Sequence, residues 1–392
     1  MTGSKNRGQE ENTMILQSRR VWTAGQFLPL QLQIEGDKIV QVLEYGSREP
    51  DEDWGDKRIV PGFIDVHTHG AYGFDTNDAE PEGLRDWMRR IPEEGVTSIL
   101  PTTVTQMPEV LLAAVKNVAD VAEGEYEGAE ILGIHFEGPF LDMEYKGAQP
   151  PEAIAVPSVE QFKKYQEAAR GHIRYITLAP EHDPGLALTR YLRQTGVVVS
   201  MGHSCATYEQ AMMAIANGAT SMTHVYNGMT AFTHRKPGLV GAAFRVRDIY
   251  GEVIADGHHS HVSALNNFYQ LKGRDFAMMV TDSLRAKHCP PGGKYQLGGH
   301  DIEITAEGLA YLKGTSTIAG STLHMNRGLQ ILVEKAMIPF DSALNSCTIN
   351  PARCLGVDDR KGKICAGYDA DMVVLEDNYD VAQTYCRGRR ML

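Results

Sequence analysis

The chain has 392 residues, of which 42% are hydrophobic and 22% are charged, and its formal net charge is -12. This composition is that of a globular protein, and the acidic balance argues against nucleic-acid binding, which needs a basic surface. No stretch approaches the roughly 18–20 consecutive apolar residues of a membrane span, so we expect no membrane segment.

The chain starts with the polar segment MTGSKNRGQEEN, which lacks the apolar core of a signal peptide. We therefore predict that residues 1–13 form a disordered extension. The six cysteines are scattered without a CxxC pair. This pattern favours reduced thiols and a cytoplasmic location over a disulfide framework.

The two ends of the chain show the same pattern of short apolar runs separated by turns that contain Gly or Asp. We predict that residues 14–59 and residues 352–392 together form one small β domain, a β-sandwich. The alternative is that the two ends are unrelated β edges.

Strand-like and helix-like segments alternate between these two ends. The predicted strands lie at residues 58–66, 96–102, 130–138, 173–181, 196–204, 219–227, 250–258 and 276–283. Amphipathic segments between them predict helices, and one of these begins at Thr207 and ends at Gly218, which suit helix caps. Eight such units in series predict an α/β fold, a (β/α)8 barrel of the TIM type, over residues 60–351.

Side chains that can bind a metal or move a proton stand at the ends of most predicted strands. His67 and His69, in VPGFIDVHTHG, alternate along an extended strand, so their imidazoles share one face. Other strand ends carry Glu137, His203, His224, Asp256, His258, His259 and Asp282. Barrel enzymes place their active sites at this end of the strands, and packing alone does not explain such a set.

Imidazole and carboxylate groups are ligands for zinc and iron-type ions with open coordination positions. Three protein ligands and a water would make one catalytic ion, whereas five or six ligands could hold two. Many two-metal barrel hydrolases bridge their ions with a modified lysine at the end of the fourth strand. Here that strand ends TLAPEHDPG, without lysine, so Glu137, in a bridging or a single-site role, would substitute for the lysine.

With these residues, the chain resembles the amidohydrolase superfamily and, more closely, the N-acetylglucosamine-6-phosphate deacetylase family. The matching stretches run from about residue 59 to residue 375 and include PGFIDVHTHG, GIHFEGPFLDMEYKGAQP, MGHSCATYEQA, IADGHH, VTDS and NPARCLG. HTH alone indicates only the superfamily. HFEGPF, THVYNGM and RKPGLVGAA together are more specific.

The resemblance implies metal-dependent hydrolysis of the acetamide of N-acetylglucosamine-6-phosphate to glucosamine-6-phosphate and acetate. Glu137, His203 and His224 would hold the main metal. His67 and His69, with Glu137 as a bridge, would complete a second site that some family members lack. The number of divalent ions, one or two, and their identity (zinc, iron, manganese or cobalt) stay open. Asp282 would be the acid/base residue.

The resemblance also implies a set of substrate contacts and a homodimer, in which Arg235 reaches the phosphate in the neighbouring site. The other implied contacts are Ala148, Gln149, Asn227, Gly228, His259, Ile318, Ala319 and Gly320. Where some members have histidine, this chain has Gln149, which can donate to a sugar hydroxyl but carries no charge.

Other functions remain open on the sequence. The closest alternative is deacetylation of N-acetylgalactosamine-6-phosphate. A cyclic-amide hydrolase or deaminase is a second, although the absent lysine weighs against the cyclic-amide type. A metal-binding scaffold that has lost turnover is the non-enzyme alternative, and the presence of Asp282 argues against it.

Overall fold

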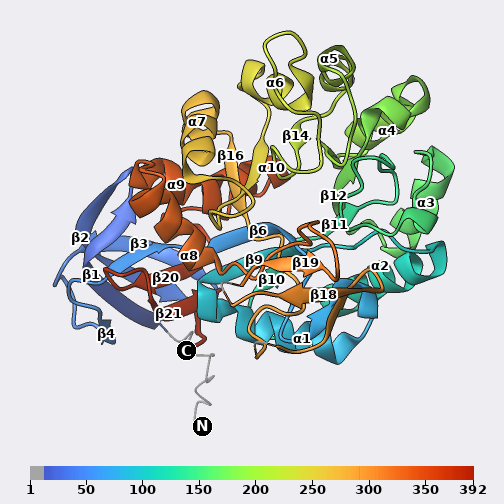
Figure 1. Ribbon diagram of the computed structural model, residues 1–392. Helices are drawn as coiled ribbons and strands as arrows, with labels where there is room; N and C mark the ends of the chain where they lie inside the picture. Colours follow the sequence, from blue (N-terminus) through green and yellow to red (C-terminus); the bar gives the residue numbers. More distant parts are fainter. Residues whose placement is uncertain (1–12, 291, 307) are drawn as a thin grey trace.

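The computed structural model describes residues 13–290, 292–306 and 308–392. The extension predicted for residues 1–13 lies outside the described residues, except for Thr13, which begins the first strand. Figure 1 shows two groups of elements: strands from both chain ends, in blue and red, and a larger body of strands and helices beside them.

Parallel strands form a ring in the larger body. They are β6 (Phe63–Thr68), β9 (Val96–Pro101), β10 (Glu130–Ile131), β11 (Ile134–Glu137), β12 (Ile173–Leu178), β13 (Val198–Met201), β14 (Ser221–Met222), β15 (Gly251–Ile254) and β16 (Ala277–Val280). Most neighbours pair directly in parallel.

Backbone hydrogen bonds join the remaining neighbours of the ring. The Thr103 N–H donates to the His135 carbonyl between β9 and β11, and the Val225 N–H donates to the Glu252 carbonyl between β14 and β15. The Asp282 N–H donates to the His67 carbonyl, at 2.8 Å, between β16 and β6. The barrel predicted from eight strand–helix units is therefore confirmed, with β10 and β11 sharing one position.

Helices surround this ring, as Figure 1 shows. They are α1 (Pro81–Arg90), α2 (Pro108–Ala122), α3 (Val159–Ala168), α4 (Ala187–Gln194), α5 (Tyr208–Ala216), α6 (Gly238–Arg245), α7 (Val262–Lys272), α8 (Met325–Gln330), α9 (Phe340–Cys347) and α10 (Ile349–Leu355). Thr207 caps α5 as predicted, because its hydroxyl accepts from the Gln210 N–H while the Gln210 side chain accepts from the Thr207 N–H.

One eight-stranded sheet contains strands from both ends of the chain. They are β1 (Thr13–Thr23), β2 (Gln26–Glu35), β3 (Lys38–Glu44), β4 (Glu52–Asp53), β5 (Arg58–Pro61), β20 (Met372–Leu375), β21 (Val381–Cys386) and β22 (Arg389–Arg390). The sheet folds back on itself, because the Ile39 N–H donates to the Tyr368 carbonyl and the Ala370 N–H donates to the Asp37 carbonyl. Its folded faces bury a separate cluster of apolar side chains that includes Leu16.

The predicted domain boundaries fall inside two elements of the structure. The boundary at 59/60 cuts β5, which pairs with β1 and β20. The boundary at 351/352 cuts α10, whose Ile349 and Leu355 pack in one cluster with Ile64 and Leu100 of the barrel strands. The positions of the domain boundaries therefore stay a prediction.

A small antiparallel sheet that we did not predict lies between β16 and α8 in the chain. It consists of β17 (Tyr295–Leu297), β18 (His300–Ile304) and β19 (Ala310–Leu312). A second short ladder, β7 (Gly70–Ala71) with β8 (Phe74–Asp75), follows β6. Both ladders stand in loops that leave the C-terminal ends of barrel strands.

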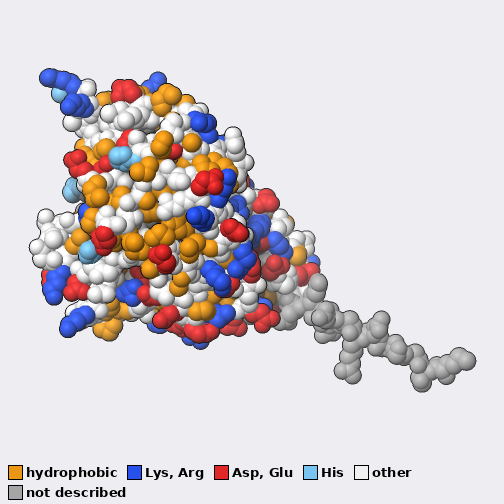
Figure 2. All heavy atoms as spheres, turned by 90° about the vertical axis from the view of Figure 1, so that its right-hand side faces the viewer, with side chains coloured by type: hydrophobic (Ala, Val, Ile, Leu, Met, Phe, Trp, Pro, Cys, Tyr) orange, Lys and Arg blue, Asp and Glu red, His pale blue; other side chains and the backbone are white. Residues whose placement is uncertain are grey.

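The surface carries mixed charge on the side that Figure 2 displays. Acidic and basic side chains are interspersed there with hydrophobic ones. Within residues 13–290, 292–306 and 308–392, we find no helix with the length and apolar character that crossing a membrane requires.

Candidate active site

A cavity of about 330 Å³ opens where the barrel strands end. It is lined by His69, Glu137, Gly147, Ala148, Gln149, His203, His224, Asn227, Gly228, Ile254, His259, Asp282, Leu297, Ser316, Thr317, Ile318 and Gly320. His67 does not line it and is completely buried, but its imidazole belongs to the same group of side chains. The structure therefore brings together all the predicted metal ligands and the predicted acid/base.

Four imidazoles share one arrangement around the Glu137 carboxylate. Each has its Nδ1 against an oxygen atom, and these oxygens are Glu252 Oε2 for His67 (2.8 Å), the Thr102 carbonyl for His69 (3.2 Å), the Tyr145 carbonyl for His203 (2.8 Å) and the Asn227 carbonyl for His224 (3.0 Å). Because a proton on Nδ1 satisfies these acceptors, each Nε2 is free to present a lone pair to a metal.

The Nε2 atoms converge on Glu137. Glu137 Oε1 lies 3.4 Å from His67 Nε2, 3.3 Å from His203 Nε2 and 3.4 Å from His224 Nε2, and Oε2 lies 3.4 Å from His69 Nε2. The donor atoms form two groups within which all lie less than 4.8 Å apart: Glu137, His203 and His224 in one, and His67, His69 and Asp282 in the other.

The polar atoms at this centre fit a divalent cation. Among the described residues, neither Glu137 Oε1 nor His67 Nε2 has a hydrogen-bond partner. Buried polar atoms are nearly always paired, and a buried charge without a partner is costly. Nitrogen and carboxylate oxygen donors in this number suit zinc, iron, manganese or cobalt.

The carboxylates and imidazoles of the site shift one another's pKa values. Burial opposes ionisation of Glu137, but the imidazoles of His67, His203 and His224 hold its pKa well below the usual range. Burial lowers the pKa of His67, but Asp282, Glu137 and Glu252 raise it to about 9. The carboxylates therefore keep their charge, as ligands of a cation must.

Three of these residues lie at strand ends with left-handed backbone. The φ angles are 47° for His203, 29° for His224 and 49° for Asp282. Residues other than glycine rarely adopt this conformation, which costs about 1–3 kcal/mol and concentrates at functional sites. Asp282 Oδ1 lies 3.1 Å from His69 Nε2 and 3.5 Å from His67 Nε2.

Residues 58–391 of the chain match the model of the amidohydrolase family. The chain belongs to this family. Amidohydrolases generally depend on divalent metal ions, which agrees with the two donor groups of the cavity.

Curated relatives carry names of amino-sugar-phosphate deacetylases. N-acetylglucosamine-6-phosphate deacetylase of Bacillus subtilis (strain 168) is 41% identical over 85% of this chain and 84% of its own. N-acetylgalactosamine-6-phosphate deacetylase of Escherichia coli O157:H7 is 32% identical over 96% of this chain and 99% of its own.

A solved structure has the same fold throughout. It is a mutant N-acetyl-D-glucosamine-6-phosphate deacetylase from Mycobacterium smegmatis in complex with N-acetyl-D-glucosamine-6-phosphate. Its TM-score is 0.92 at 32% sequence identity, and the match covers 97% of this chain and 99% of that one. The likeness therefore extends over the terminal sheet as well as the barrel.

Most of the predicted substrate contacts of this amidohydrolase line the cavity, but two do not. Ala319 is completely buried beneath its neighbours Ile318 and Gly320, and Arg235 is exposed, with its Nε directed at the adjacent His234. The side-chain amide of Gln149 is already occupied: it donates to Glu137 Oε2 and accepts from the Thr105 N–H, both at 2.7 Å. This contact orients the predicted metal-ligating carboxylate, and the second N–H of the amide leaves the expected contact with a sugar hydroxyl possible.

His259 stands at the rim with its orientation fixed by Asp256. The Asp256 Oδ2 lies 2.6 Å from His259 Nδ1, and Oδ1 accepts from the N–H groups of His258 and His259. Both residues were expected at the end of the seventh strand. Their contact leaves Nε2 of His259, which lines the cavity, available to a ligand.

Sequence reasoning missed Glu252, the buried partner of His67. It lies in the middle of β15, accepts from the Tyr175 hydroxyl at 2.6 Å and is completely buried. A charged residue inside the apolar run GEVI was the available signal. Other cavity residues that we did not predict are Gly147, Ser316 and Thr317 from loops, Ile254 at the end of β15 and Leu297 at the end of β17.

Proposed function

We propose that this amidohydrolase removes the acetyl group of N-acetylglucosamine-6-phosphate and releases glucosamine-6-phosphate and acetate. The observation that carries the proposal is the convergence of four imidazoles on Glu137, with Asp282 beside them, at the cavity where the barrel strands end. The names of the Bacillus subtilis relative and of the Mycobacterium smegmatis structure support the choice of substrate.

We further propose that Glu137, His203 and His224 hold the main divalent ion and that His67 and His69 complete a second site. A bound ion supplies Lewis acidity, which lowers the pKa of a water molecule towards about 7 and polarises a carbonyl group. Metal analysis of His67→Ala tests the second site. An unchanged ion count and unchanged turnover would exclude a second ion that the reaction needs.

Asp282 is the residue that we assign to proton transfer. Burial would raise the pKa of its carboxyl, but His67 and His69 hold that pKa well below the usual value, so the group starts as the base. Asp282 accepts a proton from the attacking water while the oxygen of that water bonds to the acetyl carbon. It then returns the proton to the sugar nitrogen as the carbon–nitrogen bond breaks, which makes the amine a better leaving group.

The phosphate needs a cationic partner that this chain's own cavity does not supply. Among the described residues that line the cavity there is no lysine or arginine. We propose that His259 and Asn227 contact the sugar phosphate and that Arg235 of a second copy of the chain completes the site in a homodimer. A guanidinium group matches the geometry of phosphate, and the exposed side chain of Arg235 is free to reach outward.

The six cysteines are free in the structure, which supports the cytoplasmic location that we propose for the enzyme.

A substrate panel tests the function and the phosphate contact together. We expect turnover of N-acetylglucosamine-6-phosphate to exceed that of N-acetylgalactosamine-6-phosphate and of both unphosphorylated sugars. Arg235→Ala should raise KM for the phosphorylated sugar more than for the unphosphorylated one, whereas the adjacent exposed Lys236→Ala should not. Preference for the galactosamine epimer would overturn the substrate assignment, and equal effects of Arg235→Ala on both sugars would overturn the phosphate role.

A further inference from the structure

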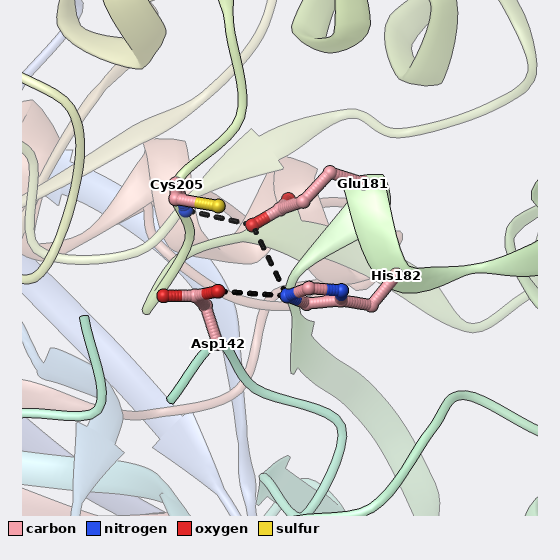
Figure 3. A group of neighbouring side chains, drawn as sticks. All are labelled: Asp142, Glu181, His182 and Cys205. Carbon is pink, nitrogen blue, oxygen red and sulfur yellow. Dashed lines mark hydrogen bonds and ion pairs between the residues drawn. The ribbon is translucent and has the colours of Figure 1, made fainter. Parts of the chain in front are cut away.

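A second group of metal-ligating side chains lies outside the catalytic cavity. Asp142 follows β11, Glu181 and His182 end the short 3-10 turn Pro180–His182 after β12, and Cys205 precedes α5. Figure 3 shows the four side chains pointing toward one another from three separate loops. None of the four lines the catalytic cavity.

The donor atoms of this group are close enough to share one ion. One donor atom of each residue, including the Cys205 sulfur, lies within 4.8 Å of the other three. His182 Nε2 is 2.7 Å from Asp142 Oδ2 and 3.9 Å from Glu181 Oε1. An ion at the centre of the group would replace these direct contacts with bonds to all four residues.

Backbone and hydroxyl donors hold the two carboxylates in place from behind. Asp142 Oδ1 accepts from the N–H groups of Glu144 and Tyr145, each at 2.9 Å, which leaves Oδ2 directed at the cluster. Glu181 Oε2 accepts from the Ser204 hydroxyl and Oε1 accepts from the Cys205 N–H, each at 2.7 Å, and Oε1 also lies 3.9 Å from His182 Nε2. These contacts orient two oxygen ligands before an ion arrives, as the outer contacts of metal sites do.

An ion pair between His182 and Asp142 explains only one of the contacts. The two carboxylate side chains are 9% and 4% exposed, and one imidazole cannot balance both charges and also account for the thiol beside them. The His182 side chain is 42% exposed, which leaves a route for an ion from solvent.

We propose that Asp142, Glu181, His182 and Cys205 bind a divalent transition-metal ion of the zinc type at a site separate from the catalytic centre. A thiolate and an imidazole favour zinc or cobalt over magnesium or calcium. The thiol proton passes to water when the metal–sulfur bond forms. Four protein ligands complete a tetrahedral shell, so the site is structural and leaves no position for a substrate.

The site is connected to the catalytic ligands through one loop. The Asp142 N–H donates to the His203 carbonyl at 2.8 Å, and the Tyr145 carbonyl accepts from His203 Nδ1 at 2.8 Å. An ion bound to Asp142 therefore fixes the segment that orients His203 and continues to Gln149. Its removal should loosen this loop while the catalytic ligands remain present.

Cobalt titration of the full-length chain after treatment with a chelator tests the proposal. A thiolate bound to Co²⁺ gives a charge-transfer absorption in the near ultraviolet, whereas the histidine and carboxylate ligands of the catalytic centre do not. We expect this absorption in the wild-type chain and in Cys365→Ser, which removes an exposed cysteine that lies in no such group. It should be lost in Cys205→Ser.

His182→Ala provides a second measurement in case Cys205→Ser folds poorly. This exposed ligand should be removable without loss of the fold, and its loss should weaken cobalt binding at the thiolate site about 10-fold or more. An absent sulfur band in the wild type, or a band that survives in Cys205→Ser, would overturn the site. Unchanged cobalt affinity in His182→Ala would also overturn it. None of these readings depends on deacetylation, so failure of the proposed activity is detected separately.

Discussion

Two buried clusters of charged residues in this protein differ in whether they balance their own charge. In the first, at the junction of β10 with the C-terminal segment, Lys361 lies 2.6 Å from Glu130 Oε2 and 2.8 Å from Asp369 Oδ2. Arg360 contacts the same two carboxylates, each at 2.6 Å, and Asp371 completes the group. Every carboxylate there faces a cation that the chain itself supplies.

The proposed catalytic cluster has no such balance among the described residues. Glu137 faces imidazoles and the uncharged Gln149 amide, Asp282 faces the imidazoles of His67 and His69, and Glu137 Oε1 and His67 Nε2 lack hydrogen-bond partners. The first cluster joins a barrel strand to the terminal sheet and so contributes to stability. The second leaves charge and lone pairs unpaired, which is the arrangement expected where a protein binds a cation and carries out chemistry. Substitutions in the two clusters should therefore separate activity from stability.

The largest effect that we expect is on catalysis by Asp282→Asn. The amide keeps the shape of the side chain but cannot take a proton from water, and general acid–base catalysis contributes about 10²- to 10⁴-fold. We therefore expect kcat to fall by about that factor while metal content at the main site and the melting temperature stay near wild type. Steady-state kinetics, metal analysis and thermal unfolding check this. Turnover near the wild-type value would remove Asp282 from the proposed role.

Lys361→Met should lower the stability of the fold and leave catalysis unchanged, which is the opposite of what we expect for Asp282→Asn. The Lys361 side chain is only 1% exposed, and its removal leaves Glu130, Asp369 and Asp371 with less positive charge. Breaking a buried pair in this way costs about 3–5 kcal/mol. We expect the free energy of unfolding in denaturant to fall by about this amount, while kcat is unchanged below the unfolding temperature.

The adjacent exposed Lys363→Met is the matched control, and its stability should stay close to wild type. If both lysine variants were equally stable, the cluster around Lys361 would contribute no more to the stability of the fold than an exposed lysine does. If Lys361→Met reduced kcat at a temperature where the chain is folded, the separation between the two clusters would be wrong.

The sequence predicted the barrel because strand-like and helix-like segments alternate regularly along the chain. Each strand is a short apolar run with a polar end, and the structure places all eight runs in one ring. The antiparallel ladder from β17 to β19 was not predicted, because it interrupts this alternation and contains no apolar run as long as those of the barrel strands. The boundaries at 59/60 and 351/352 stay a prediction; β5 and α10 span these positions, and packing between distant segments leaves no local pattern.

The sequence also predicted that the proposed metal ligands lie together, because each stands at a strand end. It could not reveal which atoms orient them. Three of the four Nδ1 partners are backbone carbonyls, of Thr102, Tyr145 and Asn227, and every residue type has such a group. The contact of Gln149 with Glu137 likewise depends on how the loop after β11 folds back over the strand end.

Gly228→Ala probes this loop-dependent half of the site, with a smaller expected effect. Gly228 has φ of 58°, and an added Cβ would lie 2.9 Å from His203 Nδ1. His203 must therefore shift, and we expect kcat/KM to fall about 10-fold, since small displacements of reacting groups are costly. Gly196→Ala is the control, because it has φ of 78° but no atom within 4 Å of its Cβ. A kinetic loss of the same size in Gly196→Ala would show that backbone strain, and not contact with His203, is responsible.

The smallest effect concerns acid stability and returns to the balanced cluster. Burial raises the pKa of Glu130, but Arg360 and Lys361 lower it to about 2, and burial raises that of Asp369 while Lys361 and Lys38 lower it, also to about 2. These values lie below those of the unfolded chain, so the folded state binds fewer protons at these two groups and the stability that Glu130 and Asp369 contribute is present above about pH 4.5. It is lost as the pH falls from there through about 2. We expect the free energy of unfolding to decrease over this interval in the wild type and in Lys363→Met, and to decrease less steeply in Lys361→Met, where the carboxylates have lost a cation. Parallel acid titrations in all three chains would instead assign the acid sensitivity to other carboxylates.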